Sequence, residues 1–255
     1  MIYIFEGIPS SGQTKRLFLR KFSAYHKNGN PGLVHPFGFT FMNKKAEDSG
    51  QISSGEVFVS AQDADIVVRY EYPSGSLMEL PLALQDVRKE CLPSTFVASS
   101  NVVGKKTGLK SIRGVVYEPK DHLLYVSDKT DHSIKRYDAT TGDFVDEIKH
   151  DDLATPIHLV FSPDGNTLYI GSIDGNSVHT WNRITHEFDT LVTEKNNAGL
   201  TQPSGIALNG YDRWLYIGSR GTRQILRFDL TDGTPDPDGP FIDNMPDEPE
   251  FLLFQ

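Results

Sequence analysis

The sequence contains one cysteine in 255 residues, Cys91, and this excludes an intramolecular disulfide and a metal centre built on several thiolates. No hydrophobic run approaches the roughly 18 residues that a membrane-spanning helix needs, so we expect no membrane span. Positive charge is also scarce, because 25 Lys and Arg residues against 34 Asp and Glu residues give a net charge of −9. Such a chain repels a phosphate backbone, so we expect no nucleic-acid partner.

Targeting and catalytic motifs are missing as well. Met1 runs directly into the apolar segment Ile2–Phe5, with no basic segment before it and no small-residue cleavage site after it, so we expect no signal peptide within the given sequence. The sequence contains neither the zinc-protease motif H-E-x-x-H nor the serine-hydrolase motif G-x-S-x-G. Motifs therefore assign neither a compartment nor a catalytic residue.

What the chain does contain is a repeating unit of short apolar runs separated by turn signals. Each complete unit has an innermost strand led by Pro or Gly, a second strand, and a third strand closed by an aromatic residue followed by an acidic or amide residue. The closing residues Tyr137, Trp181 and Phe228 lie 44 and 47 residues apart. This spacing is typical of a propeller blade, so we predict an all-β protein, a β-propeller of four-stranded antiparallel blades.

We interpret residues 1–255 as one propeller domain. The predicted divisions are a partial blade at 1–30, blades at about 35–83, 111–150, 155–194 and 202–244, a partial blade at 248–255, and an insertion at 84–110 with a short helix near Gln85–Cys91. The chain opens at a third-position strand, Ile2–Glu6, and closes at an innermost strand, Phe251–Phe254. Closing a ring there would leave backbone groups unpaired. We therefore expect a fragment, with a truncated amino terminus, of a protein that has six blades when intact.

Two loops imitate ligand-binding motifs. Gly7–Thr14 follows a strand as a phosphate-binding loop does, but Gln13 stands where such a loop has its lysine. We interpret it as a hairpin leading to a strand at Arg16–Phe22. Asp232–Gly239 is rich in aspartate like a calcium loop, but it lacks the closing glutamate. We interpret it as a turn between a third and a fourth strand.

Three segments resemble the NHL-repeat and gluconolactonase-like (senescence marker protein type) propellers: Leu124–Asp128, Phe161–Ile170 and Pro203–Leu208. The shared pattern extends over roughly residues 35 to 254. The resemblance implies the propeller fold, and it says little about function because one fold serves many functions.

The resemblance also implies where a ligand would bind. A gluconolactonase-like enzyme would hold a divalent cation through Glu, Asn and Asp at the mouth of the central channel and use an Asp as base. Glu250 and Asp128 fit that set, but Ile157 replaces the Asn, and Gly171-Ser172 displace the second Asp. Too few oxygen ligands remain for a hard cation, and this argues against such a lactonase.

An NHL-type lyase would instead need histidine ligands. His35, His132 and His158 are the candidates, and their spacing matches no local zinc signature. His158 stands where the other innermost strands have glycine, at Gly38, Gly114 and Gly205. We interpret His158 either as a general base or metal ligand, or as a hydrogen-bonded plug of the channel.

In a propeller, the loops that enter the innermost strands share one face with the loops that join second to third strands, and ligands bind there. The candidate binding residues on this face are His35, Arg113, Asp128, His132, His158, Arg220, Arg223 and Glu250; Asp174 and Asn176 belong to the wider polar set. The competing interpretation of each residue is a solvated rim. We assign no catalytic residue and no metal ligand.

The leading hypothesis is a non-catalytic binding or protein-interaction propeller. It would be a monomer, need no cofactor, and recognise a protein or a small molecule at the channel mouth. The alternative is a metal-dependent hydrolase or lyase, lactonase-like or of the NHL type, with calcium or zinc at the same place. The first hypothesis predicts tolerance of single substitutions, whereas the second predicts that changing His158 or Glu250 alone abolishes turnover.

Overall fold

The structure is a computed structural model that describes residues 2–5, 18–23, 35–45, 52–72, 74, 78, 95–252 and 254. The chain divides into two compact units, Met1–Leu109 and Lys110–Gln255. The regular elements of the described residues are strands, apart from the 3₁₀ helix Gln62–Ala64 and the four-residue helix α2, Ser100–Val103. The all-β prediction is confirmed.

The first unit begins with an antiparallel strand pair, β1 (Ile2–Phe5) and β2 (Phe18–Ser23). This is the pairing expected for two strands joined by a hairpin. The segment Gly7–Thr14 lies outside the described residues. A strand, and not a helix, occupies residues 18–23, so the helix that a phosphate-binding loop requires is not formed there.

The same unit contains one complete blade. Its strands are β3 (Pro36–Lys45), β4 (Ile52–Ala61), β5 (Ile66–Tyr72) and β6 (Thr95–Val97), in that order. The fourth strand thus lies inside 84–110, the range that the sequence analysis sets apart as an insertion, so the extra residues fall within the blade. The three residues of β6 are all buried, and Phe96 packs on Phe58 with ring centroids 5.0 Å apart. A strand this short carries no detectable alternation. The helix expected near Gln85–Cys91 lies outside the described residues.

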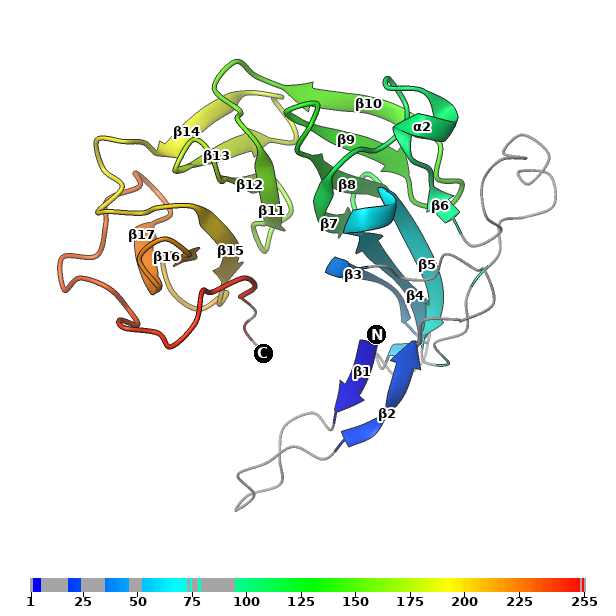
Figure 1. Cartoon of the computed structure of the whole chain (residues 1–255), viewed down its shortest axis with the longest axis horizontal. Helices are drawn as coiled ribbons and strands as arrows, with labels where there is room; N and C mark the ends of the chain where they lie inside the picture. Colours follow the sequence, from blue (N-terminus) through cyan, green and yellow to red (C-terminus); the bar gives the residue numbers. More distant parts are fainter. Residues whose placement is uncertain are drawn as a thin grey trace. The chain divides into compact units, whose positions relative to one another are not determined.

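The second unit contains three successive sheets, each a meander of antiparallel neighbours (Figure 1). This confirms the four-stranded antiparallel blade for the first two sheets. Their strands are β7 (Ile112–Glu118), β8 (Leu123–Asp128), β9 (Ser133–Asp138) and β10 (Phe144–Lys149), then β11 (Pro156–Phe161), β12 (Thr167–Ser172), β13 (Ser177–Asn182) and β14 (Phe188–Val192). The third sheet has β15 (Pro203–Leu208), β16 (Trp214–Ser219) and β17 (Gln224–Asp229).

The third sheet departs from the predicted pattern at its outer edge. In place of a fourth strand, two isolated bridges join Ile225 to Ile242 and Phe228 to Pro235. The chain here contains prolines at 235, 237 and 240, and proline cannot donate to a strand ladder. The predicted innermost strand Phe251–Phe254 is also wrong for the residues of it that are described. These residues lie against β15, where a Cβ on Gly205 would be 2.6 Å from the Leu252 nitrogen, but no described strand pairs with them.

Apolar faces of neighbouring sheets form the cores of the second unit. One cluster joins β8–β10 to β11–β13 and contains Tyr125, Ile134, Ile148, Leu153, Leu159, Leu168, Ile170 and Trp181. A second cluster joins β12–β14 to β15–β17 and contains Tyr169, Val178, Val192, Leu200, Ile206, Leu215, Ile217, Leu226 and Phe228. The middle sheet is therefore buried on both faces, which is why its inner strands are apolar at successive positions and do not alternate.

Candidate functional site

One edge of the second unit gathers the loops that the sequence analysis associates with binding. At this edge Ile112 pairs with Asp128, Pro156 with Ser172, and Pro203 with Ser219, so each innermost strand starts where each second strand ends. We call this edge the mouth face. It consists of residues 111–113, 128–132, 155–158, 172–176, 202–204, 219–223 and 248–250.

The backbone of the mouth face repeats a left-handed conformation. The residue before each innermost strand has a positive φ, at Ser111, Thr155 and Gln202, and so has the residue before each third strand, at His132, Asn176 and Arg223. Two side chains of the second group bridge to the next sheet. His132 Nδ1 accepts the Thr155 N–H over 3.0 Å, and Asn176 Oδ1 accepts the Gln202 N–H over 2.7 Å. We call these two bonds the latch; it connects the loop of one sheet to the start of the next.

Three cations belong to the mouth face. Lys129 follows β8, Arg220 follows β16 in the same register, and Arg113 is the second residue of β7. Burial and the charge of Arg113 lower the pKa of the Lys129 ammonium, the charge of Arg220 contributes in the same direction, and the Asp174 carboxylate opposes them. No hydrogen bond or ion pair joins the Lys129 ammonium to any described residue.

The carboxylates of the mouth face occupy distinct positions. Arg220 donates to Glu248 over 2.7 Å and lies 3.1 Å from the Glu250 carboxylate, so both glutamates compensate this one arginine. Asp174 is exposed, and its Oδ2 accepts a hydrogen bond of 2.5 Å from the Thr155 hydroxyl. Glu250 and Arg220, both expected at a binding site, are therefore brought together as a pair.

Asp128 is turned away from solvent. Its side chain is fully buried, with Lys135 Nζ 3.1 Å from Oδ2, and the Lys135 side chain is fully buried too. The carboxylate also accepts the backbone N–H groups of Lys110, Thr130 and Asp131. All these partners belong to the protein. The Asp128 carboxylate therefore holds the loop after β8 in place and does not face a ligand.

His158 is buried between two innermost strands. Its Nδ1 accepts the N–H of Ile206 on β15 over 3.1 Å, and its ring meets Phe251 edge to face at 4.9 Å. Burial lowers the pKa of His158 to about 4, so the imidazole is neutral at pH 7, with its proton on Nε2 because Nδ1 is an acceptor. This geometry corresponds to the plug interpretation.

The remaining candidates have exposed side chains. His35 belongs to the first unit, is exposed, and contacts Asp63 with 3.3 Å between Nδ1 and Oδ1. His132 is exposed and belongs to the latch. Arg223 is exposed, and its carbonyl oxygen accepts the Met245 N–H.

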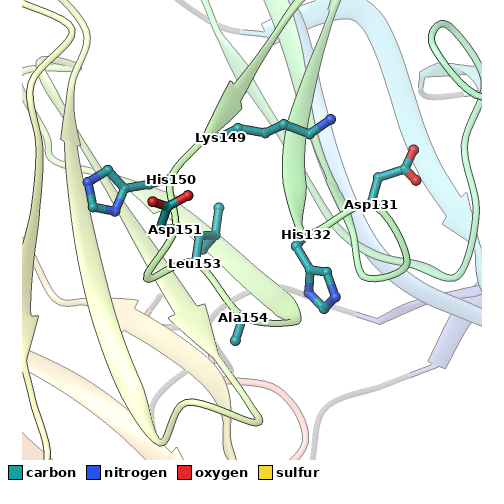
Figure 2. A pocket seen from close by; sticks show the side chains of 7 residues that line it. All are labelled: Asp131, His132, Lys149, His150, Asp151, Leu153 and Ala154. Atoms are coloured by element: carbon teal, nitrogen blue, oxygen red, sulfur yellow. The ribbon is translucent and has the colours of Figure 1, made fainter.

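A pocket of about 460 Å³ opens beside the latch. Asp131 and His132 lie on one side of it, and Lys149, His150 and Asp151 line the other (Figure 2). Among the described residues, no group of three or more His, Cys, Asp or Glu side chains is arranged to hold a metal ion. Nor does any described helix have the length and hydropathy to cross a membrane.

Sequence reasoning missed Lys129. The signal was present, because Lys129 directly follows Leu124–Asp128 just as Arg220 directly follows Leu215–Ser219. Aligning the repeats column by column places a cation at this position in two of the three sheets of the second unit. The effect of Arg220 on Lys129 depends on how the sheets stack, and no local pattern reports it.

Comparison with known proteins identifies relatives at the level of family and fold. The family profile described as "Lactonase, 7-bladed beta-propeller" matches residues 38–237. That description gives seven blades, so the expected number of six is not confirmed. No curated protein sequence matches the chain significantly.

Solved structures show the same fold at low identity. Hydrazine synthase of Kuenenia stuttgartiensis superposes with a TM-score of 0.57 at 16% identity, over 87% of this chain and 54% of that one. A chain of a nidogen/laminin complex superposes with a TM-score of 0.58 at 16% identity, over 80% of this chain and 66% of that one. The chain thus spans between half and two thirds of these relatives. They support the resemblance to NHL-repeat and gluconolactonase-like proteins at the level of the propeller superfamily.

Proposed function

The chain belongs to the lactonase family of seven-bladed β-propellers, and we propose that the mouth face of its second unit binds a small organic anion that also carries hydroxyl groups. The observation that carries this proposal is that the Lys129 ammonium, on the same face as Arg113 and Arg220, makes no hydrogen bond or ion pair to a described residue. Cations held close together repel one another, and an anion bound between them relieves that repulsion.

The charges of the site support a ligand of mixed character. Glu248 and Glu250 compensate Arg220, whereas the Lys129 ammonium has no carboxylate partner among the described residues and is the side chain that would attract an anion. Asp174 supplies acceptor oxygens for hydroxyl groups on the same ligand. A sugar acid has both features. We propose that binding needs no metal, because the carboxylates of Glu248, Glu250, Asp174, Asp128 and Asp131 are engaged with Arg220, Thr155 or Lys135 and form no ligand set among the described residues.

The experiment is a calorimetric titration with D-gluconate and D-glucuronate, and with neutral D-glucose for comparison. We expect the two acids to bind and glucose not to bind, with affinity falling as salt is added and unchanged by EDTA. Lys129→Met should weaken binding about tenfold or more, because a charge-assisted hydrogen bond contributes about 1.5–3 kcal/mol. Lys195→Met is the control, because Lys195 is exposed on the β14–β15 connection.

The outcomes separate clearly. Equal affinity for the acids and glucose, or equal affinity of Lys129→Met and wild type, would contradict anion recognition by this cluster. Loss of binding in EDTA with recovery in calcium or zinc would show that a metal binds the ligand.

The family match favours a second candidate at the same place, hydrolysis of the lactone of such an acid. Water would add to the ring carbonyl, the ring C–O bond would break, and a hydroxy acid would be released. Asp174 is the carboxylate available to accept the proton of the attacking water. Glucono-δ-lactone consumption measured by base uptake, above the spontaneous rate and lost in Asp174→Asn, would support this candidate. A rate equal to the spontaneous one would leave the binding function alone.

A further inference from the structure

Thr155 has a backbone conformation that its residue type disfavours. Its φ is 50°, in the left-handed region, where a β-branched residue is a true outlier. The two equivalent positions of the second unit, Ser111 and Gln202, share the positive φ but carry unbranched side chains. The repeat therefore demands the conformation, and it does not demand a threonine.

Two hydrogen bonds engage Thr155. Its N–H donates to His132 in the latch, as the N–H of Gln202 does to Asn176, so this bond belongs to the repeat. Its hydroxyl donates to Asp174 over 2.5 Å. At the equivalent position, the Gln202 side chain is exposed and makes no hydrogen bond to a described residue. The hydroxyl bond is thus the feature of Thr155 that the latch does not account for.

The partner of that hydroxyl is a carboxylate on the same face as Lys129, and its charge raises the pKa of the Lys129 ammonium. Asp174 and Lys129 attract each other, yet no ion pair of 4.0 Å or less joins them. Asp174 is exposed, and the one side-chain hydrogen bond given for its carboxylate among the described residues is the bond from Thr155. A hydrogen bond from a hydroxyl to a carboxylate is charge-assisted, and it orients the carboxylate.

We propose that Thr155 is a positioning residue, which holds the Asp174 carboxylate away from Lys129 and so keeps the Lys129 ammonium available to an anionic ligand. This deepens the proposed function and rests on it. The strained threonine is retained because its hydroxyl performs this task, in the way that strained backbone concentrates at binding sites.

The test compares Thr155→Ser with Thr155→Val. Serine keeps the hydroxyl and removes the β-branching, so we expect a higher Tm and gluconate affinity within twofold of wild type. Valine keeps the branched shape and removes the hydroxyl, so Asp174 pairs with Lys129, and we expect affinity to fall about fivefold or more. Thr185→Val is the matched control, because Thr185 makes the same type of bond to Glu187 at the far end of β13.

A double-mutant cycle shows whether Thr155 acts through Asp174. In the Asp174→Asn background the carboxylate charge is gone, so adding Thr155→Val should change affinity less than twofold. A purely structural role would produce the same loss in both backgrounds, and that result would overturn the proposal. Equal affinity of wild type and Thr155→Val would overturn it as well.

One readout needs no ligand. The rate at which acetic anhydride acylates Lys129, measured by mass spectrometry relative to Lys195, reports how much of the ammonium is deprotonated and accessible. We expect Thr155→Val to slow this rate at least threefold, and Thr155→Ser and Thr185→Val to leave it unchanged. If wild type binds no anion but the labelling rates differ as stated, the proposed function fails and the positioning role stands. Unchanged labelling in Thr155→Val refutes the positioning role.

Discussion

The backbone N–H of Ile206 on β15 donates to Nδ1 of His158 on β11 over 3.1 Å, so an imidazole side chain connects two innermost strands. In the preceding sheet, the innermost strand β7 has Gly114 at the position equivalent to His158. There a Cβ would lie 2.8 Å from the carbonyl oxygen of Ile157, so backbones approach directly. One propeller thus uses two ways of joining innermost strands, close approach at a glycine and a bridge through a histidine.

Replacing His158 should destabilise the fold. In His158→Ala the buried Ile206 N–H loses its acceptor, which costs about 1–3 kcal/mol, and the empty space left by the ring adds to the loss. Urea unfolding followed by tryptophan fluorescence measures the change. The error of such a measurement is about 0.5 kcal/mol. A free energy of unfolding that differs from wild type by less than this error would mean that the hydrogen bond makes no net contribution to stability.

Stability should fall in mild acid because of two buried histidines. Burial lowers the pKa of His158 and of His179 to about 4, against an ordinary value of 6.5. The unfolded chain therefore binds more protons than the folded one between pH 6.5 and pH 4. The contribution of these two neutral histidines to the free energy of unfolding is fully present above this window. It is lost as the pH falls through the window, by up to about 1.4 kcal/mol per pH unit for each histidine.

The check is the slope of unfolding free energy against pH. His179→Gln, which keeps a neutral polar side chain beside Ser177 and Thr190, should give a shallower slope between pH 6.5 and pH 4 than wild type. Parallel slopes would show that His179 is protonated in the folded protein as easily as in the unfolded chain.

Asp128 and Lys135 should behave as a structural pair. Lys135→Met leaves a buried carboxylate without its cation, which is expected to cost about 3–5 kcal/mol. Asp128→Asn should reduce stability and leave the gluconate affinity of the folded fraction unchanged. Thermal melts and calorimetry at a temperature where both variants are folded separate the two effects. A stable Asp128→Asn variant with reduced affinity would return Asp128 to the binding site.

Replacing Asn176 of the latch by glycine and by alanine should have different effects on stability. Asn176→Gly loses the 2.7 Å bond to the Gln202 N–H but accepts the φ of 45° without strain. Asn176→Ala loses the same bond and also adds the left-handed penalty of about 1–2 kcal/mol. The alanine variant should therefore unfold at lower urea concentration than the glycine variant. The reverse order would show that the backbone changes conformation when the latch opens.

Local sequence patterns were sufficient for most strands and turns. The Leu-Tyr-φ runs and the aromatic closures at Tyr137, Trp181 and Phe228 placed β8, β9, β12, β13, β16 and β17, because strand and turn preferences act between neighbours in the chain. The failures lie where local signals are weak or opposed. β6 is three residues long, and the outer edge of the third sheet contains prolines that prevent a ladder.

The sequence by itself determined the repeat, the antiparallel blades, and the end of the strands at which polar loops gather, because strand alternation and turn residues encode these features locally. Only the tertiary structure decided which polar residues stabilise the fold and which are available for binding. Asp128 and His132 are used within the protein, whereas the charges of Arg113 and Arg220, which belong to two different sheets, both act on Lys129. The reason is physical: the partners of a charged side chain depend on how blades stack, and stacking joins residues that are far apart in the chain.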